Sequence, residues 1–285
     1  MKSKNLYKYI LGIADNSLIL GQRMGELCGH GPSLETDIAC TNISLDLFGQ
    51  VRSYYQYAAK IAGDNRTEDD IAMLRKEREY VNVLLVEQPN TDFAYTMARQ
   101  FLFDVYHLLF LQELQKSKDL TLSAIANKSI KEVSYHLRFS TDWIKRLGDG
   151  TEESHQKMQD AIDDLWTYTD ELFHQTEADK AMVKEGIGVD VTKFKLMVED
   201  VRANPAHGQV EFRATGESEE MIYHGTARIG PFMAAGQEFG QTRQHILHLG
   251  LPVELQGEVE NPVDRIEPVE LALAALSDCI IGTIA

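Results

Sequence analysis

The sequence predicts a mainly α fold, a long-helix bundle followed by a small truncated α+β segment. The first 190 residues form long amphipathic segments with clear helix start and stop signals. Residues 191–285 hold 5 of the 7 prolines and 9 of the 20 glycines, and short alternating runs typical of strands lie between them. A single fold rarely changes composition so sharply, so we expect two domains, residues 1–190 and residues 191–285.

The first domain is predicted to consist of six helices with short connections. They span residues 7–26, 34–62, 67–85, 91–116, 123–147 and 151–173. Ser33 and Thr151 are suited to cap helix starts, and Gly63 is suited to end a helix. Long helices joined by short connections pack antiparallel, which favours a bundle. The aromatic side chains of Tyr54, Tyr55 and Tyr57 are expected to pack against neighbouring helices in preference to lining a ligand groove.

The second domain is predicted to begin with a helix over residues 191–203, which Pro205 stops. Alternating residues then indicate strands over 209–215, 221–229 and 244–249, with a turn at 216–218. A last helix is expected from Glu267, because Pro268 suits the first helical position. Cys279 lies on the apolar stripe of that helix.

Composition excludes several classes of function. The net charge of −16 argues against nucleic acid and against an anionic membrane surface, because both require a basic face. No apolar run approaches the roughly 18 residues of a membrane span. The three cysteines, Cys28, Cys40 and Cys279, show no CxxC spacing, which fits a reducing compartment. We therefore expect a cytoplasmic protein, with Cys28 and Cys40 buried as small hydrophobic side chains.

Long bundles often hold a di-iron centre, which needs a Glu from each of two helices and a Glu-x-x-His from each of two others. The sequence offers only partial matches. Asp104 and His107 have the i, i+3 spacing, Glu132 has His136 at i+4, and Asp46 has no His three residues later. We interpret these five residues as degenerate metal positions. In a metal-free bundle, we expect the polar groups of Asp104, His107, Glu132 and His136 to pair with each other. A stand-alone di-iron enzyme with Asp104, His107, Glu132 and His136 as ligands is the alternative.

Several long motifs in the first domain resemble the structural subunit family of bacterial phenylacetyl-CoA epoxidase. They are residues 15–26 (DNSLILGQRMGE), 29–32 (GHGP), 42–50 (NISLDLFGQ), 84–90 (LLVEQPN), 131–140 (KEVSYHLRFS) and 185–187 (EGI). The resemblance covers residues 6–195 and implies a ferritin-like fold without metal of its own. It also implies a role in aerobic phenylacetate degradation. The implied partners are the di-iron catalytic subunit and, in the wider complex, a reductase component.

The second domain resembles the N-terminal half of the OsmC-like organic hydroperoxide reductases. The motifs are residues 204–205 (NP), 210–214 (VEFRA), 251–258 (LPVELQGE) and 267–279 (EPVELALAALSDC). This resemblance implies that Cys279 is a peroxidatic thiol, which gives a second candidate function, a thiol-dependent organic hydroperoxide reductase. The sequence carries no second cysteine after Cys279 to resolve a sulfenic acid, so we expect the function to lie in the first 190 residues.

Overall fold

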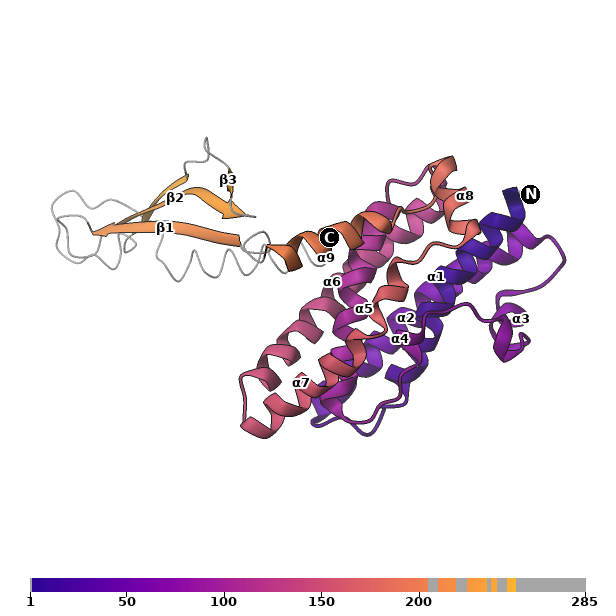
Figure 1. The fold of residues 1–285 in the computed structure, drawn as a ribbon, viewed down its shortest axis with the longest axis horizontal. Coiled ribbons are helices and arrows are strands. Elements are labelled where there is room, and N and C mark those ends of the chain that lie inside the picture. Colours follow the sequence, from indigo (N-terminus) through magenta and orange to yellow (C-terminus); the bar gives the residue numbers. More distant parts are fainter. Residues whose placement is uncertain (1, 205–209, 219–224, 235–236, 240–244, 250–285) are drawn as a thin grey trace, which may run out of the picture. The chain divides into compact units, whose positions relative to one another are not determined.

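The computed structural model describes residues 2–204, 210–218, 225–234, 237–239 and 245–249. The chain divides into two compact units, residues 1–194 and residues 195–285, which are considered separately (Figure 1). The helix α9 (Thr192–Ala203) spans the point of division.

Five long helices build the first unit. They are α1 (Lys2–Gly25), α2 (Leu34–Ala62), α5 (Phe93–Leu114), α6 (Leu120–Gly148) and α7 (Glu152–Trp166). Helix α1 packs on α2, α2 on α6, α6 on α5, and α5 on α7. Figure 1 shows these helices running side by side, as the sequence predicts for a long-helix bundle. The predicted mainly α, ferritin-like fold is therefore confirmed.

Local signals set the ends of these helices. Ser33 caps α2 by accepting a hydrogen bond from the Thr36 N–H, and Thr151 caps α7 in the same way. Gly63 ends α2 in the left-handed conformation at a φ of 66°, where a side chain would be strained. Helix α6 begins three residues before the predicted start, because Asp119 accepts hydrogen bonds from two N–H groups of its first turn.

The long helix predicted over residues 67–85 is wrong. The chain instead forms α3 (Glu68–Met73), the 3₁₀ helix η1 (Glu77–Glu79) and the short α4 (Leu84–Glu87). Side chains of α1 hold the backbone between them extended: the Val81 N–H donates to Asp15 Oδ2, and the Val83 N–H donates to Asn16 Oδ1, at 2.9 and 2.8 Å. These tertiary hydrogen bonds replace the intrahelical bonds that a continuous helix would need.

The secondary structure at the end of α7 and after it also differs from the prediction. Helix α7 ends at Trp166, and a 3₁₀ helix, η2 (Thr169–Phe173), completes the segment predicted as one helix to residue 173. Helix α8 (Glu177–Glu185), which was not predicted from the sequence, begins at a capping box between Thr176 and Asp179. Helix α8 packs on α1.

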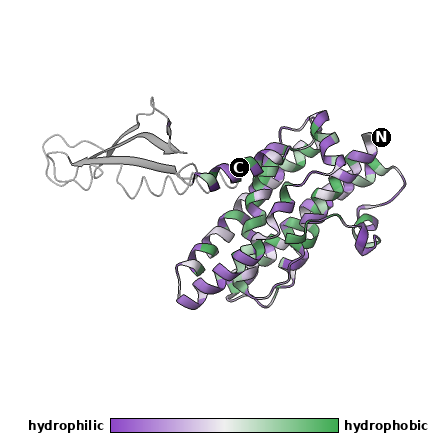
Figure 2. Cartoon of the chain, in the orientation of Figure 1, coloured by the Kyte–Doolittle hydropathy of each residue, from purple (hydrophilic) through white to green (hydrophobic). Residues whose placement is uncertain are grey.

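The apolar core of the bundle falls into two clusters along its length. One is built on residues such as Ile10, Tyr54, Leu111 and Leu122, and the other on residues such as Met24, Leu47 and Met97. Each long helix contributes apolar residues to one or both clusters, and hydrophobic and hydrophilic residues alternate along the helices (Figure 2). Tyr54 and Tyr55 are fully buried, and Tyr57 is partly buried against the first cluster, so the expected packing role of these rings is confirmed.

The second unit contains an antiparallel sheet. Its strands are β1 (Val210–Ser218), β2 (Gly225–Ala234), β3 (Gln237–Phe239) and β4 (His245–Leu249), with β2 paired to the other three. The turn predicted at residues 216–218 belongs to β1, because Ser218 pairs with Gly225 of β2. Strand β3 was not predicted from the sequence. The predicted helix from Glu267 lies outside the described residues.

Candidate functional site

A layer of polar side chains crosses the bundle at the boundary between the two apolar clusters. On α2 the clusters meet between Leu47 and Val51, and on α5 they meet between Phe103 and Phe110. The layer contains the five predicted site residues and three more on the same helices. Its members are Asp46, Gln50, Gln100, Asp104, His107, Glu132, His136 and Ser140, and we call them the polar layer.

His136 of α6 is paired with Asp46 of α2. The Nε2 atom of His136 lies 3.0 Å from Oδ2 of Asp46. The imidazole is completely buried, whereas the Asp46 side chain is 37% exposed. Gln50 lies one turn after Asp46 in α2, and Glu132 lies one turn before His136 in α6. Gln50 Nε2 donates a hydrogen bond to Glu132 Oε2 at 3.0 Å. Two polar contacts thus join α2 to α6.

Asp104 is completely buried and accepts two hydrogen bonds. Gln100 Nε2 donates to Oδ1 at 2.7 Å, and Ser140 Oγ donates to Oδ2 at 2.8 Å. Burial raises the pKa of Asp104 to about 7, although these two donors and the nearby His136 oppose the rise. The Asp104 carboxyl therefore changes its charge near neutral pH.

His107 has no hydrogen-bond partner in the described structure for either ring nitrogen. Its ring packs against Phe103, with the two ring centroids 5.1 Å apart. Burial, and next the neighbouring His136, lower the pKa of His107 to about 3. The imidazole is therefore neutral at physiological pH and behaves as an aromatic core residue.

The expected pairing among Asp104, His107, Glu132 and His136 is wrong, because in the described structure none of the four forms a hydrogen bond with another. His136 pairs instead with Asp46, Asp104 with Gln100 and Ser140, and Glu132 with Gln50, while His107 has no hydrogen-bond partner there. The partners Gln50, Gln100 and Ser140 were not predicted from the sequence. Their spacing held a signal, since Gln100 and Asp104, His136 and Ser140, and Asp46 and Gln50 are each one helical turn apart.

The polar layer does not fit a carboxylate-bridged pair of irons. The three carboxylates do not converge, because each accepts hydrogen bonds from a different amide, hydroxyl or imidazole donor. Within the described residues, no three His, Cys, Asp or Glu side chains lie close enough together to hold a metal ion. These side chains instead connect α2, α5 and α6 through hydrogen bonds.

A second buried polar group links α1 to the extended segment before α4. Arg75 donates to both carboxylate oxygens of Asp15, at 2.6 and 2.9 Å, and Tyr55 donates to Asp15 Oδ1 at 2.6 Å. The Arg75 side chain is 7% exposed and Asp15 is fully buried. The Arg75 guanidinium also lies over the ring of Tyr80, 4.2 Å from its centroid. The group therefore stabilises the fold of residues 75–83.

Comparison with known proteins decides the family. Residues 1–204 match the model of the family described as phenylacetic acid catabolic protein. This chain belongs to the phenylacetic acid catabolic protein family. A curated relative from Escherichia coli (strain K12), named as one of the subunits of 1,2-phenylacetyl-CoA epoxidase, is 52% identical over 185 residues, which is 65% of this chain and 74% of the relative.

The family match spans the whole bundle and α9 but ends before the strands. The predicted catalytic residue Cys279 lies beyond the match and outside the described residues, so the resemblance to organic hydroperoxide reductases stays a prediction. Cys40 is buried as expected, but Cys28 is exposed in the turn after α1, so its predicted burial is wrong. Among the described helices, none combines the length and the apolar character that crossing a membrane requires.

Proposed function

We propose that this chain is the structural subunit of a multicomponent phenylacetyl-CoA 1,2-epoxidase in aerobic phenylacetate degradation. In this proposal a separate catalytic subunit carries the di-iron centre, and the bundle of this chain scaffolds it. The observation that carries the proposal is the 52% identity to a protein whose name identifies it as a subunit of that epoxidase. A subunit of this kind needs partner subunits, and in the proposal one of them supplies the metal.

The polar layer supports a non-catalytic role. Its carboxylates accept hydrogen bonds from Gln50, Gln100 and Ser140, which are poor metal ligands compared with glutamate and histidine. These contacts satisfy the buried acceptors inside the protein. The alternative of a stand-alone di-iron enzyme would require several of them to break. The alternative of a hydroperoxide reductase through Cys279 draws no support from the described residues.

An exposed apolar stripe on α2 supports assembly with another subunit. Leu34, Ile38 and Leu45 are 71%, 51% and 60% exposed and lie on one face of the helix, at spacings of four and seven residues. Large apolar side chains exposed together on one face often mark a protein interface. We expect this stripe to contact the catalytic subunit.

Co-expression with the catalytic subunit tests the proposal. The complex should co-purify, convert phenylacetyl-CoA when supplied with its reductase component, and carry iron, whereas the isolated chain should carry much less than one iron per copy. An isolated chain with a stoichiometric pair of irons and epoxidase activity would overturn the assignment. Failure of the two subunits to associate would also overturn it.

Charge substitutions on α2 sharpen the test. Ile38→Glu and Leu45→Glu place carboxylates on the exposed stripe and should abolish co-purification while the isolated chain keeps its thermal stability. The matched control is Leu120→Glu, because Leu120 is 84% exposed at the start of α6, away from the stripe. Equal co-purification of all three variants would locate the interface elsewhere.

A further inference from the structure

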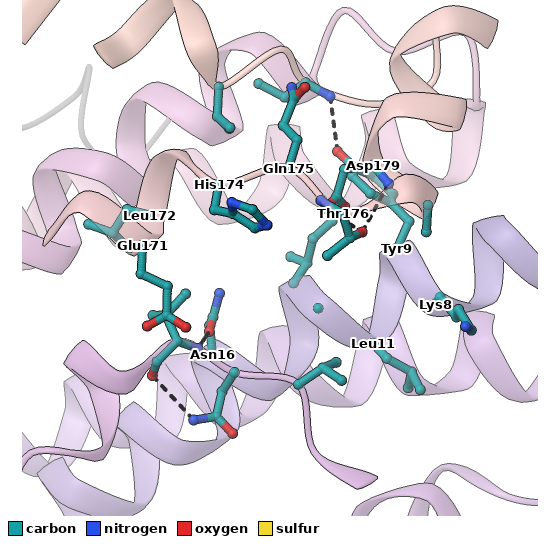
Figure 3. A pocket seen from close by; sticks show the side chains of 18 of the residues that line it. Lys8, Tyr9, Leu11, Asn16, Glu171, Leu172, His174, Gln175, Thr176 and Asp179 are labelled. Carbon is teal, nitrogen blue, oxygen red and sulfur yellow. Dashed lines mark hydrogen bonds between the residues drawn. The ribbon is translucent and has the colours of Figure 1, made fainter. Parts of the chain in front are cut away.

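We infer that a cavity beside α1 is a binding site for a small, uncharged aromatic molecule. The cavity has a volume of about 690 Å³ and lies between α1, residues 78–83, α5 and residues 171–179. Figure 3 shows the labelled side chains around an open space, with His174 and Gln175 above it, Tyr9 next to Thr176 and Asp179 at one end, and Asn16 next to Glu171 at the other. The volume lies within the range typical of small-molecule pockets, about 300–1,000 Å³.

Aromatic rings give the cavity its preference for an aromatic ligand. Phe103, Tyr106 and Phe110 of α5 and Tyr9 of α1 line it. The centroid of the Tyr106 ring lies 6.1 Å from that of Phe103 and 5.7 Å from that of Phe110, so the three rings form a continuous tilted row. Rings prefer offset or edge contacts with further rings, and a planar ligand against this row can make such contacts.

The charges around the cavity favour an uncharged ligand. His107 lines it as a neutral imidazole, and an ion placed against this wall would lose its hydration without gaining a counter-charge. The cationic side chains Lys4, Lys8 and Arg78 also line the cavity, together with the carboxylates of Glu79, Glu171, Glu177 and Asp179.

All four of these carboxylates already accept hydrogen bonds from the protein. Glu79 accepts from the Lys76 N–H, Glu171 from the Leu84 N–H, Glu177 from Lys180, and Asp179 from the Thr176 N–H. Cations and carboxylates both line the cavity, and all four carboxylates are occupied by hydrogen bonds, so the cavity offers no field of one sign to attract an ion.

Gly12 keeps the cavity open. It lies in the middle of α1, where glycine weakens a helix relative to alanine, and it lines the cavity. A Cβ atom added at Gly12 would meet no atom within 4 Å, so no close contact with a neighbouring element requires a glycine there. The missing side chain therefore leaves free space in the cavity.

All the residues that line the cavity lie in the first unit of this chain, so binding of a small molecule there is independent of the proposed function. A segment of a partner protein is the competing occupant. The size and the aromatic wall favour the small molecule, and a binding experiment separates the two.

The test uses the full-length chain and the uncharged fluorescent probe N-phenyl-1-naphthylamine, whose emission rises in an apolar site. The wild type should bind the probe saturably, at one probe per chain. Gly12→Leu should weaken binding by at least about tenfold, because the leucine fills the cavity, and Gly12→Ala should have a smaller effect. Both variants should fold at least as stably as the wild type, since each replaces a helical glycine.

The matched control is Gly49→Leu. Gly49 is also a helical glycine, in α2, and a Cβ atom added there likewise meets nothing within 4 Å, but Gly49 does not line the cavity. This variant should bind the probe as the wild type does. Absence of saturable binding by the wild type would overturn the inference, as would equal affinities of the Gly12→Leu and Gly49→Leu variants. Loss of partner association in Gly12→Leu, without probe binding by the wild type, would assign the cavity to a partner protein instead.

Discussion

The Nε2 atom of His136 lies 3.0 Å from Oδ2 of Asp46, and this contact connects α6 to α2 through an imidazole that has no exposed surface. The other ring nitrogen of His136 has no hydrogen-bond partner in the described structure. Asp46 therefore supplies the single hydrogen bond that this buried ring makes there, and it is one of two polar contacts that join the two helices.

Asp46→Ala should destabilise the protein by about 1–3 kcal/mol, because a buried donor on His136 loses its acceptor. Asp46→Asn should cost less, since the amide oxygen can still accept. Urea denaturation followed by circular dichroism measures both. Asp142→Ala, at an exposed position of α6, is the control and should change stability little. Equal stabilities of the Asp46→Ala variant and the control would show that the contact contributes nothing.

His107→Phe should remove an acid sensitivity. The folded-state pKa of His107, about 3, lies below its value in the unfolded chain, about 6.5. The stability that this group contributes is therefore fully present above about pH 6.5 and is lost as the pH falls toward 3, at up to about 1.4 kcal/mol per pH unit. Phenylalanine also removes two unpaired buried nitrogens, so the variant should be at least as stable at pH 7.

The measurement is the urea midpoint of the wild type and His107→Phe between pH 7 and pH 5. The wild type should lose stability relative to the variant as the pH falls. His155→Gln is the control, because His155 is exposed. A difference between wild type and His107→Phe that stays constant over this range would contradict a buried neutral imidazole.

Asp104→Asn should change the pH dependence in the opposite direction. The folded-state pKa of Asp104, about 7, lies above the value of about 3.9 expected for the unfolded chain. Its contribution to stability is therefore fully present below about pH 4 and is lost as the pH rises through 7. At pH 8 the variant should equal or exceed the wild type in stability, because it buries no charge there.

The same urea titration extended to pH 8 tests Asp104→Asn. Between pH 5 and pH 8 the wild type should become less stable relative to this variant, whereas His107→Phe shows its largest relative gain at the acid end. Opposite slopes for the two variants would confirm both assignments. Parallel slopes would contradict the lowered pKa of His107 and the raised pKa of Asp104.

Arg75→Ala should be the most damaging of these substitutions. It leaves the fully buried carboxylate of Asp15 without its cation, which typically costs about 3–5 kcal/mol. It also removes the guanidinium that lies over the Tyr80 ring, so residues 75–83 should become sensitive to trypsin, at Lys76 and Arg78. Tyr55→Phe removes one hydrogen bond to Asp15 and should cost about 1 kcal/mol without new cleavage. Equal protease resistance of both variants and the wild type would contradict this role of Arg75.

Much of the bundle could be predicted because its signals are local. The caps at Ser33 and Thr151 and the glycine at position 63 act within one helical turn, so pattern and propensity suffice to place the helix ends. The helix predicted over residues 67–85 failed because Asp15 and Asn16, more than sixty residues away, bind the Val81 and Val83 N–H groups. Nothing in the local sequence encodes those partners.

The site could be predicted in position but not in pairing. The spacing of Asp104, His107 and His136 placed them on the inner faces of two helices, and all three are buried. Which donor meets which carboxylate depends on how far one helix is shifted along another. Gln50, Gln100 and Ser140 were missed because amides and hydroxyls carry little weight in metal-ligand chemistry, which guided the prediction.

The two contacts between α2 and α6 together fix the alignment of these helices. Asp46 meets His136 and, one turn along α2 and one turn back along α6, Gln50 meets Glu132, so the helices run antiparallel with a single register. If α2 were shifted along α6 by one turn in one direction, Asp46 would lie against Glu132, and two carboxylates would meet in a half-buried interface. An interface made of apolar side chains alone would tolerate such a shift far better. In this protein, three of the positions that resemble degenerate metal ligands, together with Gln50, determine the register between α2 and α6.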